Sequence, residues 1–562
     1  MLTAPLLSAS DSSNHLVVSP GKQAIASAHP FATQAGLEIL NAGGNAFDAA
    51  ITVASVLAVV EPYSSGMGGG GFWLLHQAKD QRSVFLDGRE KAPSAAHSTM
   101  YQDKSGNVVR SHSINGPLAA GIPGQPAALV HLAEKYGKLP LKQTLSPAIH
   151  YAKYGFPVDE VYLKLASFRL KAMQADAMTR QTFLAEDGSL PKLGALIKQP
   201  ELAVTLERIA KAGNAGFYQG DTAQALVKNM AAYAKTDQNL PNGIWSLEDL
   251  ARYQVIEREP ITFKFGDYSF TSAPPPSAGG TALAQMFGML DALEYQPNPD
   301  SESVHTLVET MRRAYRDRAE YLGDSDFVDI PDKLYASSYH QSLAKSISQD
   351  KATDSLSLPP VLPPAQGTHT THYSILDGQG NRVSATLSVN LPFGSAYTDP
   401  DTGLLLNNEM DDFSSQPGVP NAYGLVASSA NSIQPGKRPL SSMTPTFIES
   451  EDTIAILGTP GGSRIITIVY LAALEHLKGK AVEDWVSLRR FHHQYLPDVI
   501  QHEPEAFSDI EKQALEALGH KFKSVGRQYG NMHVILWNKA KDQVTAASDP
   551  RGIGQALVVD VE

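Results

Sequence analysis

The sequence has no cysteine among its 562 residues. A chain without thiols cannot use thiolate catalysis, disulfide bonds or cysteine-ligated metal sites. This absence does not indicate a compartment, because such a chain is unaffected by the redox state of its surroundings.

Long apolar runs and long basic runs are also absent. The longest apolar stretch, residues 46–60, contains Asp48 and Thr52 and is too short to span a bilayer, so we expect a buried helix there. The net charge is −12, which disfavours binding to nucleic acids or anionic membranes. We therefore expect a small-molecule partner, no nucleic acid and no stable membrane insertion.

Periodic apolar residues predict helices at residues 283–290 and 304–315, where they recur at the i, i+3, i+4, i+7 spacing. The strand-like runs, such as residues 453–457 and 533–537, lie mostly in the last third of the chain. This order favours α+β layers over a regular alternation of strands and helices.

A predicted hairpin follows a proline-rich segment. Residues 356–367 contain four prolines, which favour an extended tether. The strand-like runs TTHYSIL and RVSATLSVN then flank the turn DGQGN. If the hairpin is symmetric about Gln379, Thr370 pairs with Ser388, and Asn390 lies at the same end of the polar face.

Taken alone, these residues name no reaction. Thr370 fits an ordinary β-branched strand residue, and single charged residues fit a solvated surface. The run GMGGGG at residues 66–71 indicates close backbone packing, because it lacks the context of a nucleotide-binding loop. His492 and His493 are neighbours in sequence, a spacing that rarely chelates one ion, so we expect structural roles for them.

Four long motifs carry more information. The runs THTTHYSILDGQGNRVSATLSVNLPFGS, LLLNNEMDDFS, KRPLSSMTPT and GTPGGSRII resemble the γ-glutamyltranspeptidase family in content, order and spacing. The likeness continues through GLEILNAGGNAFDAA, LDGREKAP, APPPSAGG and RDRAEYLGD, and so covers nearly the whole chain.

The resemblance implies a fold and a processing event. Members of this family are N-terminal nucleophile hydrolases with a four-layer αββα sandwich, an α+β fold. Their precursors cleave themselves into a large and a small subunit that stay together. We therefore expect cleavage between His369 and Thr370, with residues 1–369 and 370–562 forming one intertwined domain as a heterodimer.

The resemblance also assigns the site residues. Once freed, Thr370 carries both a nucleophilic hydroxyl and an α-amine of pKa about 8 that serves as its base. Two positions vary within the family: Ser388 is more often Thr, and Glu409 is Gln in some members. The remaining roles are Ser388 on the nucleophile, Gly461 and Gly462 as the oxyanion hole, Asn390, Glu409 and Asp412 on the substrate ammonium, Arg89, Ser441 and Ser442 on its carboxylate, and Tyr423 in a lid loop.

The implied reaction is the cleavage of γ-glutamyl amides such as glutathione. A γ-glutamyl ester on Thr370 would pass its acyl group to water, an amino acid or a dipeptide, with no cofactor and no metal. The family suggests a periplasmic or secreted location, although the start MLTAPLLSASDSS has no intact export signal.

Two other interpretations remain open from the sequence. A cephalosporin-type acylase or a poly-γ-glutamate-processing enzyme would share the fold. A non-enzymatic protein that binds small molecules would also fit the composition, but its chain would stay intact.

Overall fold

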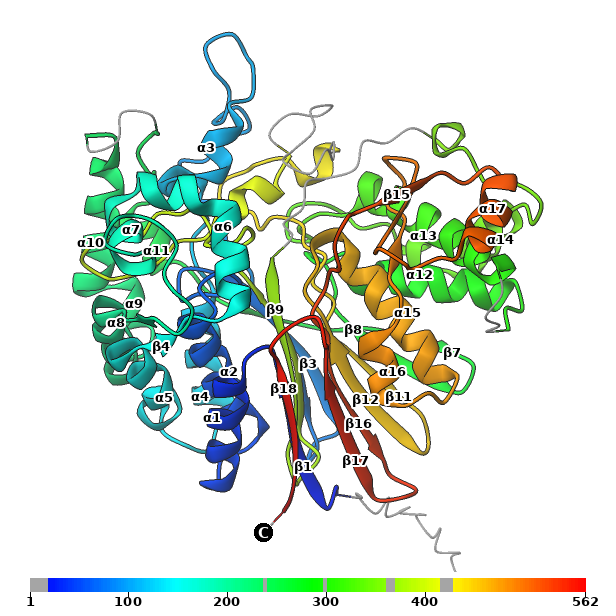
Figure 1. Ribbon diagram of the computed structural model, residues 1–562, viewed down its shortest axis with the longest axis horizontal. Coiled ribbons are helices and arrows are strands. Elements are labelled where there is room, and N and C mark those ends of the chain that lie inside the picture. Colours follow the sequence, from blue (N-terminus) through cyan, green and yellow to red (C-terminus); the bar gives the residue numbers. More distant parts are fainter. Residues whose placement is uncertain (1–18, 236–239, 297–300, 360–368, 415–427, 562) are drawn as a thin grey trace, which may run out of the picture.

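Two β-sheets stack face to face at the centre of the molecule, and helices cover the outer face of each (Figure 1). The computed structural model describes residues 19–235, 240–296, 301–359, 369–414 and 428–561. The layers follow the order helix, sheet, sheet, helix, so the expected four-layer αββα fold is confirmed.

The first sheet has seven strands in the order β18-β1-β9-β10-β2-β3-β6, all antiparallel to their neighbours. Thr370 in β9 pairs with Ser388 in β10, so the hairpin register predicted from the turn is confirmed. The strand bounds are β1 Lys22–Ser27, β2 Gly70–Gln77, β3 Arg82–Gly88, β6 Ile256–Arg258, β9 Thr370–Leu376, β10 Arg382–Ser388 and β18 Gln555–Asp560.

The second sheet has six antiparallel strands in the order β17-β16-β12-β11-β8-β7. Both strands predicted from the last third of the chain, β12 and β16, lie here. The bounds are β7 Ile261–Phe265, β8 Tyr268–Ser272, β11 Thr446–Glu449, β12 Thr453–Gly458, β16 His533–Asn538 and β17 Gln543–Ser548, and short strands elsewhere are β4 Phe156–Pro157, β5 Leu196–Ile197, β13 Phe491–His492, β14 Ile500–His502 and β15 Phe522–Ser524.

The helices outside the first sheet are built around α2, whose fifteen residues are all buried. Asn45 caps its first turn through a capping box with Asp48, and its apolar residues face neighbours on every side. The buried helix predicted over residues 46–60 is thus confirmed. This region contains α1 Pro30–Asn41, α2 Ala46–Val60, α3 Arg110–Ile114, α4 Gln125–Lys135, α5 Leu141–Tyr154, α6 Glu160–Ala175, α7 Ala177–Phe183, α8 Pro200–Ala212, α9 Ala215–Tyr218, α10 Gly220–Ala232 and α11 Leu247–Ala251.

The helices beside the second sheet include the two predicted from apolar spacing, α12 and α13. Within the described part of the chain, no helix combines the length and apolar character needed to cross a bilayer. The bounds are α12 Gly279–Ala292, α13 Ser301–Tyr321, α14 Ser337–Lys345, α15 Ile465–Leu477, α16 Val482–Ser487 and α17 Asp509–Ala517.

The polar face of the β9–β10 hairpin is buried between the two sheets. Ser374 Oγ donates to the carbonyl of His533 at 3.0 Å, and Ser384 Oγ donates to the carbonyl of Leu457 at 3.0 Å. Both acceptors lie in the second sheet, which therefore satisfies the strand hydroxyls in place of water.

Each sheet contains strands from both sides of the predicted cleavage point. In the first sheet β1 lies between β18 and β9, and in the second β8 lies beside β11. Of the eighteen strands in the described residues, ten begin at or after Thr370 and eight precede it, so the strands are less concentrated late in the chain than expected. β2, for example, is eight residues long and buried along nearly its whole length, so it lacks the alternation of apolar and polar residues that marks a half-buried strand.

The glycine run at residues 66–71 leads into β2 and packs directly on β10. A Cβ atom on Gly69 would lie 2.3 Å from the carbonyl oxygen of Ser388, and one on Gly68 would lie 2.2 Å from that of Leu405. These distances leave no room for a side chain, so the predicted close backbone packing is confirmed.

Candidate active site

Thr370 begins β9 and is 6% exposed. The hydroxyl of Ser388, across the strand pair, donates to the carbonyl of His369 at 3.3 Å, and the amide of His369 donates to the carbonyl of Asn390 at 3.0 Å. In the uncleaved chain Ser388 therefore polarises the carbonyl before Thr370. Its expected contact with the Thr370 hydroxyl stays a prediction for the processed enzyme.

Gly461 and Gly462 lie between β12 and α15, as the sequence pattern predicts. Their φ angles are 146° and 61°, which favour glycine. Neither amide donates a hydrogen bond to any described residue. Gly461 lines the same cavity as Thr370, so free donors lie beside the candidate nucleophile. Their role as an oxyanion hole stays a prediction.

The residues expected to bind the substrate head group pair with one another in this structure. Arg89 Nη1 lies 2.9 Å from Glu409 Oε2, and Arg89 Nη2 donates to Asp412 Oδ2 at 2.5 Å. The arginine follows β3 and is 1% exposed, and the two acids are at the ends of a 3-10 helix. The site thus contains a buried cluster of ion pairs. Its arginine could bind the carboxylate of an amino acid, and its acids could bind the ammonium.

The cluster holds more acid than base, because Glu90 lies 3.5 Å from Arg89 as well. Burial, followed by the charge of Glu409, raises the pKa of Asp412 and of Glu90 well above the usual range. Burial disfavours the Arg89 cation, but Glu409 and Asp412 more than offset this and raise its pKa. The arginine therefore stays charged.

Asn390 has a buried side-chain oxygen that could accept from an ammonium group, and its expected role as an ammonium ligand stays a prediction. It lies just past β10 with φ 73°, and its Nδ2 donates to the carbonyl of Asn408 at 2.8 Å. Its Oδ1 is buried and accepts no hydrogen bond from a described residue. A buried, unused carbonyl oxygen is a favourable acceptor for a charged N–H group.

Ser441 and Ser442 are buried, and Ser442 contacts an arginine that the sequence interpretation did not include in the site. Arg318, on α13, donates from Nη2 to Ser442 Oγ at 3.2 Å, and no carboxylate of a described residue lies within 4.0 Å of it. Burial lowers its pKa to about 10. Its motif, RDRAEYLGD, was noted for its family likeness, but a single arginine in a helix gave no sign of its position.

Glu61 is a second missed residue. It follows α2, is 3% exposed, and accepts a hydrogen bond from Thr371 Oγ1 at 2.7 Å. Burial, more than the opposing bond from Thr371, raises its pKa to about 7. In the sequence, the only indication of a special role for Glu61 was its position directly after an apolar helix. Acids at helix ends are common, so this position did not single it out.

The other expectations fall outside the site. Tyr423 and its loop lie outside the described residues. His492, in β13, pairs with Thr467, and His493 Nε2 pairs with Asp498 at 3.1 Å, so both have structural contacts.

One described group offers metal-ligand side chains: His305, Glu309 and His520. It lies outside the candidate site. Glu309 already pairs with Arg312 and Arg313, and His305 Nδ1 lies 2.8 Å from His520 Nε2. Two adjacent arginines oppose the binding of a cation there.

Comparisons with known proteins agree with the motifs. The model of the γ-glutamyltranspeptidase family matches residues 32–559. The glutathione hydrolase proenzyme of Pseudomonas sp. strain A14 is 40% identical over 541 residues, which cover 94% of this chain and 92% of that protein.

Solved structures extend the agreement to the fold. The cephalosporin acylase from Bacillus halodurans has a TM-score of 0.83 at 26% identity and covers 99% of both chains. The γ-glutamyltranspeptidase from Helicobacter pylori has a TM-score of 0.57 at 35% identity, over 63% of this chain and 97% of that chain. These matches confirm the expected class of enzyme, and the chain belongs to the γ-glutamyltranspeptidase family.

Proposed function

We propose that this chain is a precursor that cleaves itself before Thr370 and then transfers γ-glutamyl groups from amides such as glutathione to water, amino acids or dipeptides. The observation that carries the proposal is the placement of Thr370. Thr370 begins a strand, and Ser388 on the paired strand donates a hydrogen bond to the carbonyl of His369, the residue before Thr370. Gly461 lines the same cavity as Thr370.

Self-cleavage needs only groups already present in the precursor. The hydroxyl oxygen of Thr370 attacks the carbonyl carbon of His369, while the bond from Ser388 stabilises the charge that develops on the carbonyl oxygen. The C–N bond breaks, and the hydroxyl proton goes to the departing nitrogen. Water then hydrolyses the ester, which leaves Thr370 with a free α-amine and a free hydroxyl.

The same oxygen then acts on the substrate. The α-amine takes the hydroxyl proton as Thr370 attacks the γ-carbonyl, and the amides of Gly461 and Gly462 stabilise the oxyanion. The donor's C–N bond breaks, and the proton passes to the leaving amine. In the second half, water or an acceptor amine attacks the ester, returns its proton, and frees Thr370.

The ion cluster explains how a zwitterionic head group would enter a buried site. The substrate carboxylate would form an ion pair with Arg89. The substrate ammonium would pair with Glu409 and Asp412, which pair with Arg89 in this structure. Asn390 Oδ1 accepts from the same ammonium. Because the substrate brings one charge of each sign, it leaves the net charge of the buried cluster unchanged.

Two anilide substrates distinguish the proposed γ-glutamyl transferase from an acylase that does not require the amino-acid head group of the substrate. The similarity to a cephalosporin acylase makes that alternative worth testing. We expect γ-glutamyl-4-nitroanilide to react with a kcat/KM at least about 100-fold higher than glutaryl-4-nitroanilide, which lacks the ammonium and leaves buried acids unpaired. A Thr370→Ala variant should release no nitroaniline from either. A preference for the glutaryl compound would contradict the proposal.

A further inference from the structure

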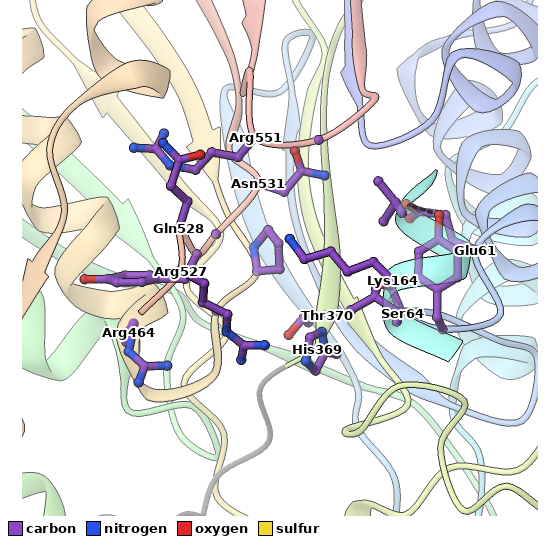
Figure 2. A pocket seen from close by; sticks show the side chains of 18 residues that line it. Glu61, Ser64, Lys164, His369, Thr370, Arg464, Arg527, Gln528, Asn531 and Arg551 are labelled. Carbon is purple, nitrogen blue, oxygen red and sulfur yellow. Dashed lines mark hydrogen bonds between the residues drawn. The ribbon is translucent and has the colours of Figure 1, made fainter. Parts of the chain in front are cut away.

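A cavity of about 160 Å³ lies beside Thr370 and carries a positive charge (Figure 2). Four of the charged residues that line it are cations, Lys164, Arg464, Arg527 and Arg551, and one is an acid, Glu61. The chain as a whole has a net charge of −12, so this lining is opposite to the average of the molecule.

Two of the cations are available to a ligand. Neither Lys164 nor Arg527 has a carboxylate of a described residue within 4.0 Å, and the guanidinium of Arg527 lies 5.4 Å from the ring centre of Phe168. In contrast, Arg551 is held by Glu503 at 2.7 Å and by Asp549 at 3.1 Å. The free charge of the cavity therefore comes chiefly from its two exposed cations.

The cavity is assembled from distant parts of the chain. Lys164 extends from α6, while Arg527 precedes β16 and Arg464 precedes α15. Figure 2 shows Lys164 reaching in from one side and the two arginines from the other, with His369 and Thr370 between them. After the proposed cleavage, the lysine would belong to the large chain and the arginines to the small one.

The positive field reaches the cleavage point itself. Burial, together with the charges of Arg527 and Lys164, lowers the pKa of His369 to about 3. The head-group residues Arg89, Glu409 and Asp412 do not line this cavity. The two charged sites therefore share no charged residue.

We propose that this cavity binds the carboxylate of the amino acid or dipeptide on the amine side of the scissile bond. The inference rests on the proposed function. With the γ-glutamyl group in the cluster of Arg89, the amine portion of the donor must leave Thr370 in another direction. The leaving amine and the acceptor amine occupy equivalent places about the same carbonyl, so one cavity serves both halves of the reaction.

The chemistry of the substrates fits the lining. The cysteinylglycine released from glutathione ends in a carboxylate, as amino-acid and dipeptide acceptors do. Lys164 supplies a mobile ammonium and Arg527 a planar guanidinium, both of which form charge-assisted hydrogen bonds with carboxylates. Glu61 weakens this preference only in part, because its pKa of about 7 leaves it partly neutral near neutral pH.

The donor test uses two substrates that differ by one carboxylate in the leaving group: γ-glutamyl-4-nitroanilide and γ-glutamyl-3-carboxy-4-nitroanilide. In the processed enzyme carrying both Lys164→Met and Arg527→Gln, we expect kcat/KM for the carboxylated substrate to fall about tenfold relative to the neutral one. Lys142→Met, an exposed lysine outside the cavity, is the matched control and should leave the ratio unchanged.

The acceptor test uses the neutral anilide as donor and compares glycylglycine with glycylglycinamide. The double variant should lose its preference for the acid over the amide. A loss in one test alone assigns the cavity to that half of the reaction. An unchanged ratio in both tests, or an equal loss for charged and neutral compounds, would overturn the inference. Failure of the proposed function is distinct, since the unmodified protein would then release no nitroaniline.

Discussion

Ser388 illustrates how a single hydroxyl acquires a role from its strand register. It lies opposite Thr370, and its Oγ donates to the carbonyl that self-cleavage would attack. The sequence interpretation identified the pairing from the turn, but it expected the bond to reach the nucleophile. The difference follows from the state of the chain, because the His369 carbonyl is still in place before cleavage.

Removing this hydroxyl should slow self-cleavage. We expect Ser388→Ala to reduce the rate about 10- to 100-fold, since one donor to the developing oxyanion is lost. The measurement is a pulse-chase of newly translated chain on a denaturing gel. Ser388→Thr keeps a hydroxyl and should cleave at a rate near that of the unmodified chain. Cleavage of Ser388→Ala at full speed would show that the bond is not used.

Glu61 gives a prediction about pH. Its pKa in the folded chain is about 7, above the usual glutamate value of 4.5. The folded state therefore favours the protonated acid. This contribution to stability is complete below about pH 4.5, and it is lost as the pH rises through 7.

A neutral substitute should not show this loss. In an uncleaved Thr370→Ala background, we expect Glu61→Gln to gain thermal stability relative to its parent between pH 5 and pH 8, by up to about 3 kcal/mol. Glu207→Gln, at an exposed position on α8, should show no such trend. A stability difference that stays constant across this range would contradict the assignment of a raised pKa.

At the scale of elements, some features could be predicted because one segment determines them. The helix at residues 46–60 is predominantly apolar and is buried on all sides, and the hairpin register follows from its turn. The burial of the hairpin's polar face could not be predicted. It depends on β12 and β16, whose carbonyls accept from Ser374 and Ser384, and no local pattern connects strands so far apart.

The glycine run offers a matched pair of variants on one short element. A Cβ on Gly69 would lie 2.3 Å from the Ser388 carbonyl oxygen, whereas one on Gly66 would meet its nearest neighbour at 3.4 Å. We expect Gly69→Ala to destabilise the chain by about 2 kcal/mol and to slow self-cleavage by displacing β10. Denaturant unfolding measures the first effect.

Gly66→Ala controls for the loss of a glycine in the same run and should change stability little. Equal stability losses in the two variants would show that chain flexibility, and not the contact with Ser388, requires the glycine at position 69.

At the scale of the whole molecule, the site joins residues that are remote in sequence. Arg89 meets Asp412 across 323 positions, and the sequence alone gave no means to foresee that these two would neutralise each other. The family motifs identified each residue separately. The pairing arises because a buried charge is costly unless an opposite charge lies beside it.

The interleaved sheets predict the behaviour of the processed protein. β1 lies between β18 and β9, so separating the two chains would break both sheets. We expect the cleaved protein to elute as one species in gel filtration and to dissociate only in the denaturant range where its sheets unfold. Release of a folded small chain without denaturant would contradict this picture.

The central claim is that Thr370 becomes the first residue of its own chain. Mass spectrometry and N-terminal sequencing of active protein test it most directly. The account predicts two chains, the smaller comprising residues 370–562 and beginning Thr-Thr-His-Tyr-Ser, and a Thr370→Ala variant that stays whole. Full activity in an intact chain, or a small chain that begins at any other residue, would contradict it.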